Sequence, residues 1–314
     1  MMNIAIFGAT SQIAKDLIEF FSNQTSYKCT LFTRDVDVVQ TWLNKVEIYK
    51  DYRISDYLDF STDDHYDVII NFVGVGNPAQ AKEMGSTIFD ITYEYDMMIL
   101  AYLKIHPECK YLFLSSGAVY GGDFENPVTN ETVASIPINN LNETHWYTIA
   151  KLYAEARHRA LPEYSIIDIR VFNYFSHTQD MNANFFITEL VRALQKKEVF
   201  KTSADNIVRD FITPTDFFNL IQSVLEVGHI NLPIDCFTKE PVSKFDLLKE
   251  LGQKFGLNHE SYGDVSAVNA TGLKMNYFSI KKIDKEINYK PKMSSMEGIL
   301  FELGTVLSKD SEEF

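Results

Sequence analysis

The sequence predicts an α/β fold with a doubly wound parallel sheet and a smaller C-terminal lobe. Two observations lead to this fold class. Short apolar runs alternate with segments of helical periodicity through the first half of the chain, and the alternation weakens after Phe172. Strands that alternate with helices build parallel sheets whose two faces are both covered. At 314 residues the chain is also long enough for a large α/β unit with a companion.

The expected elements follow in chain order. Strands are predicted at residues 4–7, 29–33, 68–73, 111–115 and 165–171, and a helix at 13–21 follows the first strand. Later helices are predicted at 185–197, 214–227, 243–255 and the C-terminal end, with loops marked by Gly256, Gly263 and Gly272. We therefore expect a first domain at 1–172, rejoined by about 207–238, and a second lobe made of 173–206 and 239–314.

The composition is that of a folded, acidic protein. Hydrophobic residues make up 46% of the chain and charged residues 23%, close to globular averages. The 43 acidic and 29 basic residues give a formal net charge of −14, which opposes binding to nucleic acid or to an anionic membrane surface. We expect neither as a partner, although a local Arg or a helix N-terminus can still bind an anionic ligand.

The cysteines and the chain start bear on compartment and metal content. Cys29, Cys109 and Cys236 lie far apart and form no CxxC pattern, so neither a disulfide framework nor a zinc site is predicted, and no metal is expected. The first residues lack a basic stretch before their short apolar run, and no segment approaches ~18 uninterrupted apolar residues. We expect a cytoplasmic protein without a membrane span.

A turn rich in small residues follows the first predicted strand and opens the first helix. Its spacing is that of GxxGxxA, with Ser in place of the middle Gly. Small residues here let backbone amides approach a pyrophosphate, which also meets the positive end of the helix dipole. We expect a Rossmann-type cofactor site formed by Gly8, Ala9, Thr10, Ser11, Gln12 and Ile13. The pattern also fits an ordinary strand-to-helix turn.

The end of the second predicted strand bears on the choice of cofactor. Thr33 and Arg34 stand where an acidic residue would bond the ribose hydroxyls of NAD. An Arg there can pair with the 2′-phosphate of NADP, so NADP is the expected cofactor and NAD the alternative. Asp35 follows directly, and a solvated surface Arg beside it is the competing interpretation.

Three side chains suggest a hydride-transfer site. Tyr147 and Lys151 are four residues apart, so on a helix they share one face. A nearby Lys cation favours the ionised form of a Tyr, which makes the phenol usable in proton transfer closer to neutrality. Ser116 lies upstream at the end of a predicted strand, where open α/β sheets place groups that contact ligands, and it can hydrogen-bond the reacting oxygen.

Several motifs together resemble a known family, the extended short-chain dehydrogenases also called NAD-dependent epimerase/dehydratases. The resemblance runs along most of the chain in the family's order and spacing. It is carried by GATSQIA at Gly8, NFVG at Asn71, SSGAVYG at Ser115, YTIAK at Tyr147, RVFNYF at Arg170 and VRDFI at Val208.

The resemblance implies roles for residues beyond the cofactor turn. Ser116, Tyr147 and Lys151 would form the catalytic triad, with Tyr147 and Lys151 also contacting the cofactor. Phe72, Val73 and Gly74 would line the cofactor. Asn173 and Arg209 would meet the phosphates of a nucleotide sugar bound by the smaller, substrate-binding lobe. From the residues alone, Asn173 fits a structural turn equally well, and Arg209 could pair with Asp210 at the surface.

The chain departs from the family pattern at three places, one of which is Asp90 where the family usually has Asn. Dehydratases of the family carry an Asp-Glu pair after the catalytic hydroxyl residue, where this chain has Gly117 and Ala118, so dehydration is disfavoured. His145 stands just before Tyr147, which is unusual, and it would either face the sugar or pack against its neighbours.

The resemblance leaves three functions to compare. The first is NADPH-dependent reduction of the 4-keto group of a nucleotide-linked 4-keto-6-deoxysugar, with dTDP- or CDP-sugars of surface polysaccharide synthesis preferred. The alternative is a nucleotide-sugar 4-epimerase with tightly bound NAD. The third is a non-catalytic dinucleotide sensor, against which the intact Ser116, Tyr147 and Lys151 argue. The family also implies a homodimer.

Overall fold

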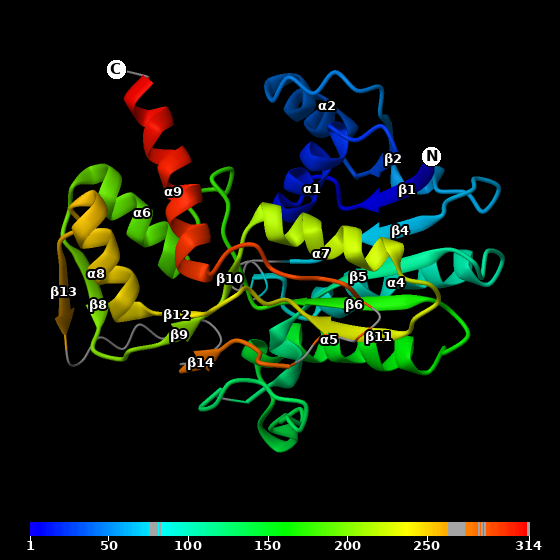
Figure 1. Ribbon diagram of the computed structural model, residues 1–314. Coiled ribbons are helices and arrows are strands. Elements are labelled where there is room, and N and C mark those ends of the chain that lie inside the picture. The colour runs from blue at the N-terminus through cyan, green and yellow to red at the C-terminus, as the bar shows by residue number, and fades with distance from the viewer. Residues whose placement is uncertain are drawn as a thin grey trace.

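A seven-stranded parallel sheet forms the larger part of the protein, which is described here from a computed structural model (Figure 1). The structure describes residues 1–75, 81, 83–122, 124–262, 274–281, 283, 285 and 287–312. The strands of the sheet are β1 (Met2–Phe7), β2 (Tyr27–Phe32), β3 (Arg53–Ser55), β4 (Val68–Asn71), β5 (Lys110–Ser116), β6 (Ile166–Val171) and β11 (Leu232–Asp235). They are ordered β11-β6-β5-β4-β1-β2-β3, which confirms the predicted Rossmann-type sheet.

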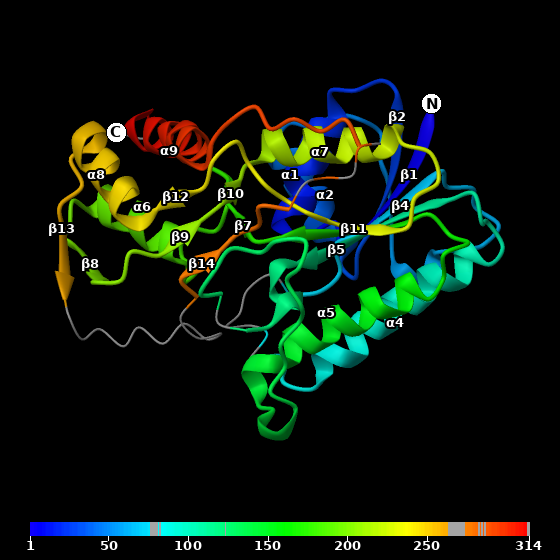
Figure 2. The same ribbon diagram turned by 60° about the horizontal axis from the view of Figure 1, so that its bottom comes forward.

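Helices cover both faces of this sheet (Figure 2). On one face lie α1 (Gln12–Ser22), α2 (Val36–Lys45) and α7 (Pro214–Glu226), and on the other lie α4 (Thr87–Leu103) and α5 (Glu143–Arg159). Alternate side chains of β1 divide between the two layers, since Ile4 and Ile6 pack in the core with α1 and α7, whereas Ala5 and Phe7 pack in the core with α4 and α5. This two-residue alternation explains why the central strands are apolar throughout.

The C-terminal lobe is built from three helices and short strands. The helices are α6 (Phe186–Lys196), α8 (Lys244–Phe255) and α9 (Ser295–Glu312), and they share a separate apolar core. The short strand pairs are β8 (Phe200–Ser203) with β13 (His259–Tyr262), and β7 (Asn173–Tyr174) with β10 (Phe211–Ile212). A third small sheet joins β9 (Val208–Arg209) to β12 (Val242–Ser243) and β14 (Asn276–Tyr277).

The predicted strands and helices correspond to β1, β2, β4, β5, β6, α1, α6, α7, α8 and α9, with ends that differ by a few residues. No sequence pattern indicated β3, β8, β11, β13 or the two-residue strands, because segments of two to four residues carry little periodicity. Gly263 and Gly272 lie outside the described residues. In the stretch 207–238, which we assigned to the first domain, α7 packs on α1 and β11 joins the main sheet, whereas β9 pairs with strands of the lobe.

No helix in the described part of the chain is long and apolar enough to cross a membrane.

Candidate active site

The turn between β1 and α1 depends on a glycine. Gly8 has φ +79°, and a Cβ on it would lie 2.8 Å from the Phe72 carbonyl carbon and 2.9 Å from the Val73 nitrogen. The ends of β1 and β4 therefore approach each other too closely for any side chain at position 8. Ser11 is the N-cap of α1, and its hydroxyl accepts from the Ala14 amide at 3.3 Å. This use as a cap explains why Ser replaces the middle Gly of the motif.

The remaining amides of the first turn of α1 have no intrahelical acceptor, as in any helix, and point out of its N-terminus. A turn without side-chain bulk at Gly8 opens onto them. This combination fits the pyrophosphate of a dinucleotide, whose charge also interacts favourably with the helix dipole. Gln12 is drawn away from the turn, because its side-chain amide donates to Asp16 at 3.1 Å.

The end of β4 brings the second predicted cofactor segment to the same edge. A Cβ on Gly74 would lie 3.3 Å from the Lys151 Nζ. The segment of Phe72, Val73 and Gly74 therefore lies between the Gly8 turn and the Lys151 ammonium. These are the positions expected around the nicotinamide half of a dinucleotide bound at the carboxyl ends of the strands.

Helix α5 presents Tyr147 and Lys151 to this edge. The helix begins with a capping box, in which the Asn142 side chain accepts from the Thr144 amide and the His145 Nδ1 accepts from the Asn142 amide at 3.2 Å. His145 is therefore engaged in capping helix α5. Of the two roles left open for it, the structure favours the local structural one.

The Lys151 ammonium is anchored below the site. Its Nζ donates to the Leu114 carbonyl oxygen at 2.7 Å and lies 4.3 Å from the centre of the Phe113 ring. Burial lowers the pKa of Lys151 to about 8, although the negative charges of Asp96 and Glu155 act to raise it. Both contacts tie the side chain to β5, so its position relative to Ser116 is fixed by the sheet.

The structure corrects one expectation about Tyr147. We expected the Lys151 cation to lower the pKa of this phenol, but burial raises the pKa of Tyr147, and the opposing influence is a hydrogen bond from Ser116. The physical reason is that the Lys151 ammonium is directed at the Leu114 carbonyl, while loss of solvent disfavours the phenolate. In this state Tyr147 is a protonated phenol beside the Ser116 hydroxyl.

Tyr277 completes the polar group around Ser116, and no sequence motif indicated it. Its hydroxyl lies 3.3 Å from the Ser116 Oγ, and burial raises its pKa. Tyr277 belongs to β14, which reaches the site from the C-terminal lobe. Ser116 is thus shared between Tyr147 of the first domain and Tyr277 of the lobe.

Two cations lie against the ring of Tyr277. The Arg209 guanidinium carbon is 5.9 Å and the Lys274 Nζ is 4.3 Å from the ring centre. Burial lowers the pKa of Arg209 to about 10, and burial together with the Arg209 charge lowers the pKa of Lys274 to about 8. Two poorly solvated cations side by side favour an anionic ligand. Lys274, like Tyr277, was not anticipated.

Arg209 and Asp210 do not form an ion pair with each other in the structure. Arg209 donates from Nη1 to the carbonyl oxygens of Val208 at 2.7 Å and Met275 at 3.4 Å. Asp210 instead accepts from the Thr238 amide at 2.9 Å and the Ser295 hydroxyl at 2.9 Å. The guanidinium is therefore held by neutral carbonyls, which leaves its charge available to a phosphate.

The side-chain amide of Asn173 is held by two backbone carbonyls. Its Nδ2 donates to the carbonyl oxygens of Asp210 and Tyr277, each at 3.3 Å. Both amide hydrogens are engaged, which favours the structural alternative. Asn173 joins β7 to the segment that carries Tyr277 and so orients that residue.

The positions after Ser116 carry no acid or base. A Cβ on Gly117 would lie 2.3 Å from the Phe172 ring, so this ring occupies the space of a side chain. Ala118 is buried, and its amide donates to the Ser116 Oγ at 3.1 Å. The packing thus leaves no room for a side chain at position 117, and the chain lacks the Asp-Glu pair of the family's dehydratases.

The residues after β2 have separate roles. Thr33 is buried, and its Oγ1 accepts from the Asp35 amide at 3.1 Å. Asp35 caps α2 by accepting from the Val38 amide at 3.1 Å. The Asp35 carboxylate is thus engaged as a cap, while the exposed Arg34 lies near Tyr57, whose hydroxyl accepts from the Gly8 amide at 3.0 Å. Arg34 is therefore on the same side as the cofactor turn.

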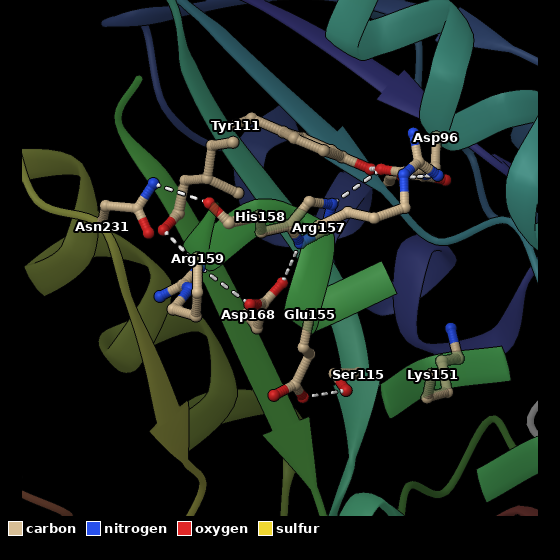
Figure 3. A network of polar contacts seen from close by, with 12 residues as sticks. Asp96, Tyr111, Ser115, Lys151, Glu155, Arg157, His158, Arg159, Asp168 and Asn231 are labelled. Carbon is tan, nitrogen blue, oxygen red and sulfur yellow. Dashed lines mark hydrogen bonds and ion pairs between the residues drawn. The ribbon is translucent and has the colours of Figure 1, made fainter. Parts of the chain in front are cut away.

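A buried polar network lies between helix α5 and the sheet (Figure 3). His158 donates from Nδ1 to Asp168 at 2.6 Å and from Nε2 to Asp96 at 2.8 Å. Glu155 accepts from the Ser115 hydroxyl at 2.6 Å and pairs with Arg170. Since Lys151, Glu155 and His158 follow one another at helical spacing, the face of α5 that carries Lys151 continues into this network.

The sheet and the side chains at its carboxyl edge define a class of protein, the extended short-chain dehydrogenase/reductases. The profile of the NAD dependent epimerase/dehydratase family matches residues 4–232. The chain belongs to this family of nucleotide-sugar modifying enzymes.

Solved structures share the fold at low sequence identity. The UDP-glucuronic acid 4-epimerase of Bacillus cereus, in complex with UDP-glucuronic acid and NAD, has a TM-score of 0.76 and 16% identity, with 98% of this chain and 100% of that chain covered. The UDP-glucose 4-epimerase of Bifidobacterium longum, with NAD+ and UDP, has a TM-score of 0.75 and 18% identity, with both chains covered to 100%.

A dehydratase is similar to the same extent. The dTDP-glucose 4,6-dehydratase of Bacillus anthracis, in complex with NAD, has a TM-score of 0.74 and 18% identity, with 99% of this chain and 98% of that chain covered. No curated protein matches the chain.

Proposed function

We propose that the protein is a nucleotide-sugar 4-epimerase that works with a bound nicotinamide dinucleotide. The observation that carries the proposal is the group of Ser116, Tyr147 and Lys151 at the carboxyl edge of the sheet, beside a turn that excludes a side chain at Gly8. The 4-epimerases of similar fold, which bind NAD and UDP or a UDP-sugar, support it. The sequence favoured reduction instead, with epimerisation as the alternative.

The side chains of the site fit proton transfer at a sugar hydroxyl. A dinucleotide bound at the Gly8 turn supplies the chemistry of accepting and returning a hydride at C4. Because Tyr147 is a protonated phenol in this structure, it must first release its own proton to water. The phenolate then takes the proton of the C4 hydroxyl and later returns it, and Ser116 holds the same oxygen by a hydrogen bond. Lys151 contributes a positive charge next to Gly74, where it can hold the hydroxyls of the nicotinamide ribose.

Epimerisation also needs an anchor away from the reacting carbon. The hydride must return to the opposite face of the transient ketone, so the sugar has to turn while the nucleotide stays bound. Arg209 and Lys274 are suited to this task, because they present two poorly solvated cations beside Tyr277. We propose the diphosphate of the substrate as their ligand. Elimination of water does not fit, since Gly117 and Ala118 supply no acid or base.

A second candidate, NADPH-dependent reduction of a nucleotide-linked 4-keto-6-deoxysugar, is favoured by Arg34. Its exposed guanidinium lies near the cofactor turn, and Asp35, its nearest acidic neighbour in sequence, is engaged as the cap of α2. A 2′-phosphate would give this guanidinium charge-assisted hydrogen bonds that a ribose hydroxyl does not match. dTDP- or CDP-linked sugars are the expected substrates of this reaction.

One experiment separates the two candidates. The purified enzyme is incubated with UDP-, dTDP- and CDP-sugars and, separately, with 4-keto-sugars plus NADPH or NADH. An epimerase interconverts C4 epimers without net change in absorbance of the reduced cofactor, whereas a reductase consumes NADPH in proportion to product. Mass spectrometry of the dinucleotide that remains bound through purification identifies the cofactor.

The Arg34→Ala variant addresses the cofactor directly. If Arg34 binds a 2′-phosphate, the variant loses NADPH affinity while NADH affinity changes little. Equal affinity changes for both cofactors, or a preference of the unmodified enzyme for NADH, remove the support for the reductase.

A further inference from the structure

Three potential metal ligands meet at the edge of the sheet opposite the active site. His65 lies in the loop before β4, and His106 and Glu108 lie in the loop before β5. Because the strands are parallel, both loops are at the amino ends of the strands, whereas Ser116 and the Gly8 turn are at the carboxyl ends. The cluster is therefore independent of the proposed reaction.

The separations within the cluster are close to those of a metal site. One ligand atom from each residue lies within 4.8 Å of the other two, and the His106 Nδ1 is 3.5 Å from the Glu108 Oε1. Tetrahedral ligands at bond lengths of ~2.05 Å lie about 3.4 Å apart. One pair already has this spacing. The side chain of His65 is 55% exposed, which leaves space for it to turn toward the other two.

The orientation of the His106 ring suits metal binding. Its Nε2 lies 2.8 Å from the Thr62 carbonyl oxygen, which can only accept a hydrogen bond. Nε2 is therefore the donor to this carbonyl, and Nδ1, the nitrogen beside Glu108, is the one that a cation can reach. A backbone carbonyl on the remote ring nitrogen is the usual partner of a metal-binding His.

A single buried residue, Tyr102, orders both histidines. Its ring stacks on the His106 ring with centroids 4.3 Å apart. Its hydroxyl accepts from the Tyr66 amide at 2.8 Å and donates to the Asp64 carbonyl oxygen at 3.0 Å, and these two residues flank His65. Tyr102 is 0% exposed, so it is a rigid support for two loops that are about 40 residues apart in the sequence.

His65 has a carboxylate partner of its own. The Asp67 Oδ1 lies 3.5 Å from the His65 Nε2, and the other oxygen of Asp67 accepts from the Asn3 amide at 2.7 Å. Asp67 is thus fixed by β1 and can hold the remote nitrogen of a His65 ring that binds a cation through Nδ1. Carboxylate–histidine pairs of this kind orient metal ligands and increase their basicity.

We propose that His65, His106 and Glu108 bind one divalent transition-metal cation, with Zn²⁺ the ion best suited to the donor set. Two imidazoles and one carboxylate favour zinc, nickel, cobalt or copper over magnesium, which prefers oxygen ligands. Water would fill the fourth position, because the cluster faces solvent. The cation would join the loop before β4 to the loop before β5.

The test is a Zn²⁺ titration of the full chain against a chromogenic zinc chelator, repeated with His65→Gln and Glu108→Gln. The unmodified protein should bind one equivalent, and each variant should lose about tenfold or more in affinity. Both changed side chains are exposed, and unchanged thermal unfolding in the absence of metal verifies that the variants fold. Excess Mg²⁺ should not compete.

A matched control is His229→Gln. His229 is also exposed and has a ring nitrogen 3.1 Å from a backbone carbonyl, that of Pro162, but it lies outside the cluster. This variant should keep the affinity of the unmodified chain. The proposal is overturned if the unmodified protein does not bind Zn²⁺, or if His65→Gln and Glu108→Gln bind it as tightly as His229→Gln does.

Discussion

The ion pairs of His158 make a measurable contribution to stability that depends on pH. His158 is 0% exposed, and its two ring nitrogens face Asp168 and Asp96. Burial by itself would lower the pKa of His158, but the two carboxylates outweigh burial and raise it from 6.5 to about 9. At ~1.4 kcal/mol per pH unit, this difference corresponds to about 3 kcal/mol of stability.

The pH window follows from the sign of the shift. Because the pKa is higher in the folded state, the stabilisation is fully present below pH 6.5 and is lost as the pH rises through about 9. His158→Gln should therefore lower the free energy of unfolding by about 3 kcal/mol near pH 6.5, similar to the ~3–5 kcal/mol cost of breaking a buried ion pair. The difference from the unmodified protein should become smaller towards about pH 9.

Urea unfolding at several pH values between 6 and 9.5 measures this difference, with His229→Gln as the exposed control. The m-value should stay constant, so that a change in midpoint reports stability. A loss that is the same at every pH would refute the assignment of a charged His158. A loss below about 1 kcal/mol would show that Arg157 and Arg159, which also pair with Asp96 and Asp168, suffice to compensate these carboxylates.

Three further predictions concern the active site. Tyr147→Phe should reduce turnover by ~10²-fold or more, because it removes one proton-transfer hydroxyl and little volume. Dinucleotide binding, measured by fluorescence titration, should stay nearly unchanged. A folded variant with normal turnover would exclude Tyr147 from the mechanism. The turnover rate should fall above pH about 8, where the Lys151 ammonium loses its proton, and a flat profile from about pH 7 to 9.5 would mean that this charge is not used. In calorimetry, Arg209→Lys should bind a nucleoside diphosphate more weakly than the unmodified enzyme does, and Arg209→Ala more weakly still. The reason is that Lys keeps the charge but loses the two-pronged geometry, and Ala loses both. Unchanged affinity in Arg209→Ala would assign this residue a structural role.

Local patterns in the sequence were sufficient for five of the strands of the main sheet. Strands β1, β2, β4, β5 and β6 are mainly apolar, and the Gly8 turn has its own spacing, so both are visible in short windows. Tyr147 and Lys151 share a face because they lie four residues apart on one helix. The sequence-based prediction of a lowered Tyr147 pKa was wrong. Burial of the phenol and the direction of the Lys151 ammonium depend on residues that are remote in the sequence.

The tertiary structure decided which remote side chains meet. Ser116 and Tyr277 are 161 positions apart in the sequence, and no local periodicity relates β14 to β5. The same holds for Lys274 beside Arg209, and for His65 beside His106 and Glu108. The sequence determined the elements, because hydrophobic period and turn chemistry act within a few residues. The order of the strands and the packing of the lobe decided the neighbours of each polar group, because hydrogen bonds and charge interactions act over a few ångströms in space, whatever the separation along the chain.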